Sequence, residues 1–571
     1  MDSPKEGDHT ASCTSPAQGK GESGSQKKSL KRTASVPTNV KAKKKRKKAK
    51  VTQPARLGYT IQKGEDMLLV ISNNQYHDSA WFPPKKKSKK KKPRGPKGKT
   101  EDTWIKKKQK RVHTKSKVSK NPAVDTSLQT QSDTDDRWGQ NFPEEVLIKV
   151  FQIVVCQDGA VPFLCRVARV CHLWNTAASS PLLWRHVTLG YCWIQPGRNQ
   201  RPHTEKMIKE TLTWLACNRL SQLRGLSICH WTKNVNYAIE VMSQSCPHLE
   251  SLTLPYCKGL TEKAFQSLGL HSQSLQIINL QYSEFQVEGL VDLLESHGSQ
   301  IKQILFTHGP KNEKILAAVY KGCCPDLELL EINTKLDSKE CQLQLCIQAL
   351  QHGCPKLKTL RMLNVIPIIK VMRKMPESTS GFPLLEELCL ATTSFSLITD
   401  KDLWDILFDS TKLQVLDLRG CFRITTSGLA ALPCLELECL FWDNISTGIV
   451  SFPKRGLNML TQKWSETLRE LDITNHVFIE EDLEMAISSL TLATNSDTLR
   501  FLNFSGTRIT PSAVRSVISR STGLKYLNLS SCRHLPRGLK RVYRGQEDIC
   551  QLLEIGVGSG KSMSSRRKLG A

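Results

Sequence analysis

The sequence predicts an α/β solenoid, a horseshoe of parallel strands with helices on its outer side, preceded by a small all-α domain and a basic N-terminal tail. One sequence motif recurs along the 571-residue chain: an apolar residue, two variable residues, an apolar residue, one variable residue and another apolar residue. A helical apolar stretch precedes these repeats, and basic residues are concentrated before residue 121. A regular period is typical of stacked units that are each too small to bury their own apolar face.

The motif occurs twelve times, and each occurrence begins a unit that is predicted to form a short strand followed by a helix. In the unit 246–273, Leu249 and Leu252 point inward, while Phe265 and Leu268 line a helix. The helices are expected outside, because a parallel sheet needs its faces covered. The units are leucine-rich repeats that begin at Leu223, Leu249, Leu275, Ile301, Leu327, Leu357, Leu385, Leu413, Leu437, Leu468, Leu499 and Leu524.

The variable residues beside the last two apolar positions of each motif are expected on the concave face, because side chains alternate along a strand. In the later units these residues are mostly acidic, with aromatic residues among them, which predicts a mildly acidic surface for a basic partner segment. The alternative is that these positions are simply solvated. The candidate substrate-binding residues are Glu331, Arg361, Glu387, Asp417, Arg419, Phe441, Asp443, Glu470, Asp472, Phe501 and Tyr526.

Residues 1–137 predict a disordered basic tail, because Lys, Ser, Pro and Gly dominate and apolar residues are too sparse to offset the entropy of ordering. Residues 57–71 end in an apolar run and are a candidate docking segment. Two basic runs, residues 41–50 and 85–92, are typical of nuclear localisation signals or polyanion-binding patches. The candidate nuclear-localisation residues are Lys43, Lys44, Lys45, Arg46, Lys47, Lys48, Lys85, Lys86, Lys87, Lys89 and Lys90.

The basic runs contain no interleaved aromatic residues on which bases could stack. Any binding of RNA or DNA by the tail is therefore expected to be non-specific and strongly salt-dependent. We expect the protein in the nucleus, nucleolar retention included, and also in the cytoplasm. The plain alternative is a solvated tail without a specific partner.

Residues 138–188 predict three short helices. Asn141 is a candidate N-cap, with Pro143 just inside the first helix and Glu144 in its first turn, where a carboxylate suits the helix dipole. Gly159 is expected to end that helix. Three helices make such a small core that the unit is expected to be stable mainly when it packs against something larger.

The residues of this stretch are similar to an F-box. The resemblance rests on Phe142-Pro143-Glu144-Glu145-Val146-Leu147, on Val150-Phe151, on Val167-x-x-Val170-Cys171-x-x-Trp174 and on Leu182-Leu183-Trp184-Arg185. Phe142 stands where the family usually has Leu, and residues 156–162 lack the common Asp-Leu. Followed by leucine-rich repeats, the chain resembles the F-box and leucine-rich-repeat class of ubiquitin-ligase substrate receptors over about residues 138–545.

The resemblance implies a non-catalytic substrate-recognition subunit of an SCF ligase, in which the F-box docks on the Skp-type adaptor of the cullin–RING ligase core. The repeats would then capture a protein substrate for ubiquitination and proteasomal degradation. The alternative for the helical stretch is that it merely caps the first turn of the repeat array. The residues that the resemblance assigns to adaptor binding are Phe142, Pro143, Val146, Leu147, Val150, Phe151, Val170, Cys171 and Trp174.

Composition and motifs argue against several other classes of protein. No run of 18 apolar residues predicts a membrane span, and the polar first 20 residues do not resemble a signal peptide. The 20 cysteines are therefore expected as thiols, and those in register with the repeat, such as Cys257 and Cys421, as small buried hydrophobes. Zinc spacings, phosphate loops and nucleophile motifs are missing from the sequence, so we expect neither metal nor cofactor.

Two other functions stay open. In one, the protein is a nuclear or nucleolar scaffold whose tail binds nucleic acid while the repeats hold a protein without ubiquitination. In the other, the chain is a catalytic ligase with its own nucleophilic cysteine. The predicted organisation is a tail at 1–137, an F-box at 138–188, a linker and cap at 189–222, repeats at 223–545 and a C-terminal tail at 546–571.

Overall fold

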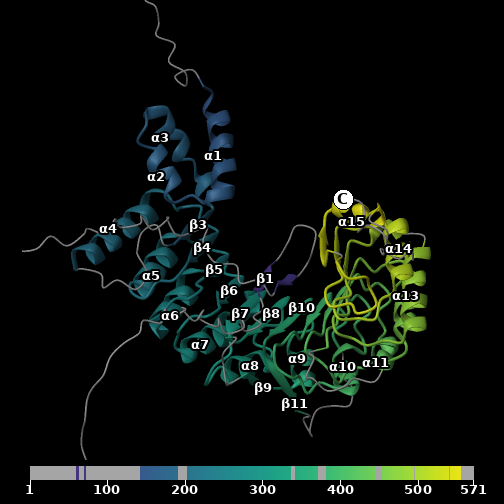
Figure 1. The fold of residues 1–571 in the computed structure, drawn as a ribbon. Coiled ribbons are helices and arrows are strands. Elements are labelled where there is room, and N and C mark those ends of the chain that lie inside the picture. The colour runs from purple at the N-terminus through teal and green to yellow at the C-terminus, as the bar shows by residue number, and fades with distance from the viewer. Residues whose placement is uncertain are drawn as a thin grey trace, which may run out of the picture. The chain divides into compact units, whose positions relative to one another are not determined.

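The protein is represented by a computed structural model that describes residues 60–62, 70–72, 142–190, 202–335, 341–370, 381–444, 453–493, 496–538 and 540–554. These residues lie in one compact unit, Leu57–Ala571. Its main feature is a 14-stranded sheet followed along its length by helices (Figure 1). Within these residues, no helix is both long and apolar enough to cross a membrane.

The first domain is helical. It consists of α1 (Glu144–Asp158), α2 (Phe163–Val167), α3 (His172–Ala178) and the 3-10 helix η1 (Pro181–Trp184). As predicted, Gly159 ends α1, with a φ of 84° that favours glycine. Pro143 is the N-cap of α1 rather than its first residue, and Asn141 lies outside the described residues. The second of the three predicted helices, expected from Phe163 to Trp174, is divided between α2 and α3.

Aromatic side chains form the core of the helical domain. The Phe151 ring is 2% exposed and meets the rings of Phe163 and Trp174 edge-on, with centroids 5.5 and 5.3 Å apart. The indole nitrogen of buried Trp184 donates a hydrogen bond to the Ala178 carbonyl at 2.8 Å. This core belongs to the same hydrophobic cluster as the interior of the repeats, as expected for a domain too small to stand alone.

All twelve predicted strands are present, and they pair in parallel in the order of the chain. Two strands close the ends of this sheet, β3 (His186–Leu189), parallel to β4, and β18 (Val542–Arg544), antiparallel to β17. The twelve strands are β4 (Gly225–Ile228), β5 (Ser251–Thr253), β6 (Ile277–Leu280), β7 (Gln303–Thr307), β8 (Leu329–Asn333), β10 (Thr359–Leu363), β12 (Glu387–Cys389), β13 (Val415–Asp417), β14 (Cys439–Phe441), β15 (Glu470–Asp472), β16 (Phe501–Asn503) and β17 (Tyr526–Asn528).

The helices of the repeats lie on the outer side of the array, and the strands line its inner, concave side (Figure 1). The predicted fold class, a helical domain followed by a leucine-rich-repeat solenoid, is therefore confirmed. The helices are α4 (Pro202–Asn218), α5 (Val235–Ser245), α6 (Glu262–His271), α7 (Val287–His297), η2 (Gly298–Gln300), α8 (Glu313–Tyr320), α9 (Ile347–Gly353), α10 (Asp400–Leu407), α11 (Thr426–Ala431), α12 (Leu457–Lys463), α13 (Glu480–Leu492), η3 (Ser496–Thr498), α14 (Pro511–Arg520) and α15 (Gln546–Glu554).

Two small sheets add to the repeat pattern. The strands β9 (Gln342–Leu345) and β11 (Ile366–Ile369) form a parallel pair in the two units that begin at Leu327 and Leu357, which are longer than the first four. The strands β1 (Thr60–Gln62) and β2 (Val70–Ser72) pair antiparallel at the predicted docking segment. Both basic runs, and with them all the candidate nuclear-localisation residues, lie outside the described residues.

The interior of the solenoid is a ladder of apolar side chains, one from the middle of each strand. In register across neighbouring strands, Leu388, Leu416, Leu440, Leu471 and Leu502 are each at most 1% exposed. Each rung touches the next, so one unit buries the apolar face of its neighbour. The array is therefore held together mainly by apolar burial between adjacent units.

The cysteines in register with the repeat are buried thiols, as predicted. Cys257 and Cys421 are both fully buried. Burial raises the pKa of the Cys257 thiol to about 11 and that of Cys421 to about 12. These thiols stay protonated near neutral pH, so they act as small apolar side chains rather than as nucleophiles.

The ladder predicts a large stability loss for Leu416→Ala, whose side chain is 0% exposed. Removing it leaves a cavity that the neighbouring rungs cannot fill, and we expect a loss of about 3 kcal/mol in the free energy of unfolding. Denaturant unfolding monitored by circular dichroism measures this loss. The matched change Leu270→Ala, at a residue that is 72% exposed, should cost about 0.5 kcal/mol or less. Equal losses in the two variants would contradict the ladder as the source of stability.

Candidate protein-binding surfaces

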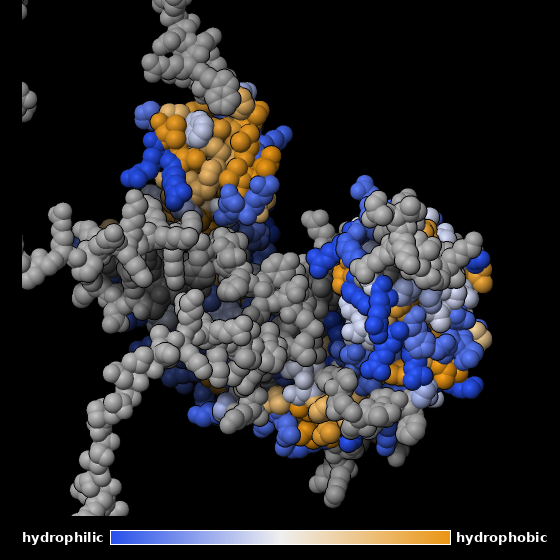
Figure 2. Space-filling model, in the orientation of Figure 1, coloured by the Kyte–Doolittle hydropathy of each residue, from blue (hydrophilic) through white to orange (hydrophobic). Residues whose placement is uncertain are grey.

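An apolar stripe runs along α1 on the helical domain. Val146, Val150 and Ile153 are 41%, 45% and 62% exposed. Their spacing of four and three residues places them on one face of the helix. Val170 and Leu182 are also more than half exposed, and Figure 2 shows apolar residues gathered on the visible face of this domain. Exposed apolar residues in such numbers on so small a domain mark an interaction surface.

The predicted adaptor-binding residues divide into an exposed and a buried set. Val146, Val150, Val170, Pro143 and Cys171 are exposed, and Phe142 and Trp174 are half-buried. Leu147 and Phe151 do not reach the surface, because they are 5% and 2% exposed and fill the core beneath α1. For these two residues the prediction of direct contact is corrected, and they support the surface from below. Sequence reasoning missed Ile153, although its spacing from Val146 and Val150 could have revealed it.

The concave side of the later repeats carries two rows of side chains, set by the register of the strands. Neighbouring strands lie about 5 Å apart, so residues in one row are direct neighbours. The first row contains Glu387, Val415, Cys439, Glu470, Phe501 and Tyr526. The second row contains Glu331, Arg361, Cys389, Asp417, Phe441, Asp472 and Asn503.

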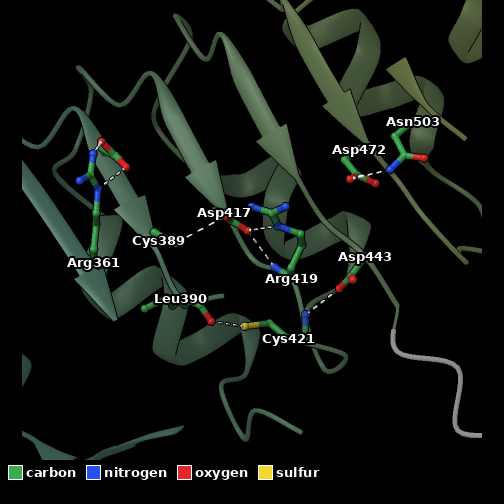
Figure 3. A network of polar contacts seen from close by, with 11 residues as sticks. Arg361, Cys389, Leu390, Asp417, Arg419, Cys421, Asp443, Asp472 and Asn503 are labelled. Carbon is green, nitrogen blue, oxygen red and sulfur yellow. Dashed lines mark hydrogen bonds and ion pairs between the residues drawn. The ribbon is translucent and has the colours of Figure 1, made fainter. Parts of the chain in front are cut away.

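Arginine–carboxylate pairs lie on this face, and the Arg361–Glu387 pair joins the two rows (Figure 3). Arg361 donates to both carboxylate oxygens of Glu387, from Nε at 2.6 Å and from Nη2 at 2.7 Å, and its Nη1 lies 3.3 Å from Glu331. Arg419 donates from Nε to Asp417 at 2.9 Å, and a second bond joins its Nη2 to the other oxygen of Asp417. Paired geometry of this kind offsets the desolvation of both charges.

Most of the predicted concave residues are more buried than expected. Strand alternation placed them on one face, as predicted. The alternative that these positions are simply solvated does not fit seven of them, which are all at most 8% exposed: Glu331, Glu387, Asp417, Arg419, Phe441, Glu470 and Asp472. Arg361, Asp443, Phe501 and Tyr526 are half-buried. The close spacing of strands lets neighbouring side chains cover one another, and ion pairs compensate the buried charges. Direct substrate contact by these residues stays a prediction.

Two carboxyl groups of this face have strongly raised pKa values. Burial, with the nearby Asp472 charge, raises the pKa of Asp443 to about 7, although the Gly420 backbone N–H donates to it at 2.8 Å. Burial likewise raises the pKa of Glu470 to about 7, against the weaker influence of Arg500 and Arg419. These groups are therefore poorly compensated in their charged form.

Aromatic rings stand beside these carboxyl groups. The Phe501 and Tyr526 rings stack with centroids 4.5 Å apart and planes within 3°. Phe441 meets Phe501 edge-on at 6.3 Å, and the Arg419 guanidinium lies 4.9 Å from the centre of the Phe441 ring. The face thus combines negative charge with ring surfaces, which suits binding rather than bond chemistry.

The early repeats carry a second aromatic feature, which sequence reasoning missed. His230, Tyr256 and Tyr282 recur every 26 residues, and their rings stack at 4.5 and 4.8 Å. All three have left-handed φ angles of 58–61°, at a turn where later units place Gly420 or Asn475. Bulky residues adopt this conformation at a cost, which marks the turns as candidate functional positions.

Within the described part of the chain, no group of three His, Cys, Asp or Glu residues is placed to hold a metal ion. The thiols nearest the acidic face are Cys389 and Cys439, and burial raises the pKa of both well above its ordinary value.

Comparison with known proteins agrees with this architecture. The family model "F-box-like" matches residues 140–190, and a "Leucine Rich repeat" model matches residues 409–432. The described residues thus form a helical F-box-like domain joined to a repeat solenoid. The chain combines an F-box-like domain with leucine-rich repeats, the architecture of the F-box and leucine-rich-repeat protein family.

Among solved structures, the chain is similar to one titled "Crystal structure of Rad7 and Elc1 complex in yeast". The sequences are 15% identical, the match covers 69% of this chain and 83% of that chain, and the TM-score is 0.34. A likeness at this level does not bear on function.

The raised pKa of Asp443, about 7, predicts a pH-dependent effect of Asp443→Asn. Between the unfolded-state pKa near 4 and about 7, the folded protein keeps a proton that the unfolded chain releases, so wild-type stability falls as the pH rises through this window. Asparagine can still accept from Gly420 and does not ionise. Relative to wild type, the variant should gain about 2 kcal/mol between pH 5 and pH 8. Denaturant unfolding at both pH values checks this, and a pH-independent difference would contradict it.

Proposed function

We propose that this protein is the substrate-recognition subunit of an SCF-type cullin–RING ubiquitin ligase. In this role the F-box binds a Skp-type adaptor, and the leucine-rich repeats hold a protein substrate for ubiquitination. The observation that carries the proposal is the exposed apolar stripe of Val146, Val150 and Ile153 on a domain that matches an F-box model.

The chemistry of the stripe supports adaptor binding. Three branched apolar side chains in solvent gain most from a partner that covers them, since each buried aliphatic side chain contributes about 1.5–3 kcal/mol. Beneath them Leu147 and Phe151 are buried, and the Phe151 ring packs against Trp174 on α3. The surface is therefore already formed before the partner binds. A surface formed in advance costs little ordering entropy on association.

The repeats support substrate capture. Stacked units create an extended concave surface, and here it carries aromatic rings among fixed charges. Such a receptor acts by raising the local concentration of substrate near the ligase, which needs no catalytic group of its own. F-box and leucine-rich-repeat proteins are typically non-catalytic receptor subunits, which fits this role.

A second function, a nuclear or nucleolar scaffold, is favoured by the basic runs at residues 41–50 and 85–92. We propose that these runs direct nuclear import, and that any nucleic acid they bind is held without sequence preference. In a scaffold, the tail would retain RNA in a salt-sensitive manner while the F-box bound no adaptor. Adaptor binding therefore separates the two functions.

The proposal predicts that Val150→Lys combined with Ile153→Lys abolishes co-purification with the Skp-type adaptor. Two ammonium groups in an apolar interface cannot be desolvated without partners, so affinity should fall by about a hundredfold or more. Both residues are exposed, and the fold should survive. Immunoprecipitation of the full chain from cells, with quantitative blotting for the adaptor, measures the effect.

Gln152→Lys is the matched control, because Gln152 is an exposed polar residue on the same helix. It adds one positive charge of the same kind to α1 outside the apolar stripe and should leave the adaptor bound. Retention of the adaptor by the doubly substituted variant, with melting unchanged, would refute the proposed function.

A further inference from the structure

A buried carboxylate with one unpaired oxygen lies on the concave face. Glu470 on β15 is 2% exposed, and its Oε2 accepts no hydrogen bond. Its neighbours in the same row are Cys439 on β14 and Phe501 on β16, neither of which supplies a positive charge. Buried polar groups in native proteins are nearly always paired, so a missing partner is itself informative.

The other carboxylates of this face are better satisfied. Glu387 is paired with Arg361 and Asp417 with Arg419. Asp472 accepts from the Thr474 backbone at 3.0 Å, from the Thr474 hydroxyl at 2.6 Å and from the Asn503 amide at 2.9 Å.

Asp443 accepts from the Gly420 backbone N–H and is attracted by the Arg419 charge without forming an ion pair with it. Taking only the residues that the structure describes, no lysine or arginine forms an ion pair with Asp443, Glu470 or Asp472. The charges of Arg500 and Arg419 attract Glu470 and oppose the effect of burial on its pKa, but its Oε2 accepts no hydrogen bond. In their ionised form, Asp443 and Glu470 therefore give this part of the face an excess of negative charge.

Aromatic rings flank the unpaired carboxylate. Phe501 follows Glu470 in the row and stacks on Tyr526, and both rings are half-buried, so this end of the row is open toward the concave side. Ring faces attract cations most strongly where water is excluded. A carboxylate next to aromatic rings suits a guanidinium or an ammonium group and disfavours a neutral or acidic one.

We propose that the half-buried rings of Phe501 and Tyr526 hold a lysine or arginine side chain from a basic segment of the protein that the repeats hold, and that the buried Glu470 carboxylate beside them attracts its charge. This inference rests on the proposed function, in which the repeats capture a protein. Asp472 is two residues from Glu470 on the same strand, about 7 Å away, which matches the spacing of alternate side chains in an extended peptide. A second basic residue two positions along the segment would therefore meet Asp472 or its neighbour Asp443.

The test measures binding of a fluorescein-labelled decapeptide, (Arg-Ala)5, to the full chain by fluorescence anisotropy. Wild type should bind this peptide and should not bind (Gln-Ala)5. Glu470→Gln should weaken binding of (Arg-Ala)5 by about tenfold or more, because the pairing charge is lost while the shape is kept. Equal affinity of Glu470→Gln and wild type would overturn the proposal.

Two controls separate recognition from folding. Glu481→Gln, an exposed residue on α13 of the same repeat, should leave the affinity unchanged. The melting temperature of Glu470→Gln at pH 8 should equal or exceed that of wild type, since the substitution removes an unpaired buried charge. A clearly lower melting temperature would make Glu470 a structural residue and overturn the proposal.

A final arm distinguishes a partner from the chain's own basic tail, which has the same chemistry. In the full chain, the lysines of residues 41–50 and 85–92 are replaced by glutamine. Unchanged affinity for (Arg-Ala)5 supports the assignment to a partner. An affinity about tenfold or more higher would show that the tail occupies the site in the wild type, because a tethered tail competes with the peptide at high effective concentration. Adaptor co-purification is measured in parallel, so loss of peptide binding and loss of adaptor binding are read separately.

Discussion

Register between adjacent units is the constraint on which the rest of the structure depends. The leucines in the middle of each strand stack in a dry ladder, and a slip of one residue would turn that ladder toward the concave face. The same register aligns the variable residues into rows, so Arg361 meets Glu387 across the sheet. Apolar burial thus determines which polar side chains are neighbours on the concave face.

The concave charges are a compromise between stability and recognition. Asp417 and Arg419 are almost fully buried, and a buried ion pair contributes little net stability. Removing one partner is nevertheless destabilising, because it leaves the other charge buried and unpaired. Pairs of this kind hold the neighbouring side chains in place. Against that rigid background an unpaired group such as Glu470 keeps its position without a local partner, so a ligand would meet an oriented carboxylate and need not order it.

Much of this architecture could be predicted from the sequence, because a strict apolar period dictates both strand position and inward direction. Leu249 and Leu416 took their predicted places, and so did Gly159 at the end of α1. Burial of Asp417 and Leu147 could not be predicted, since it depends on neighbours far away in the chain. The strands β9 and β11 likewise depend on contacts between units, which the pattern of one unit does not encode. The stacked turns at Tyr256 and Tyr282 could have been predicted, because these residues recur at the 26-residue interval of the early repeats.

The central claim is that one chain presents two surfaces for two different proteins, the apolar stripe on α1 for an adaptor and the concave strands for a substrate. Amide hydrogen exchange of the full chain, with and without a Skp-type adaptor, tests it most directly. The account predicts that the adaptor slows exchange across α1 to α3, residues 144–178, and leaves β12 to β17 unchanged. Protection on β12 to β17 with no change in α1 would contradict the account.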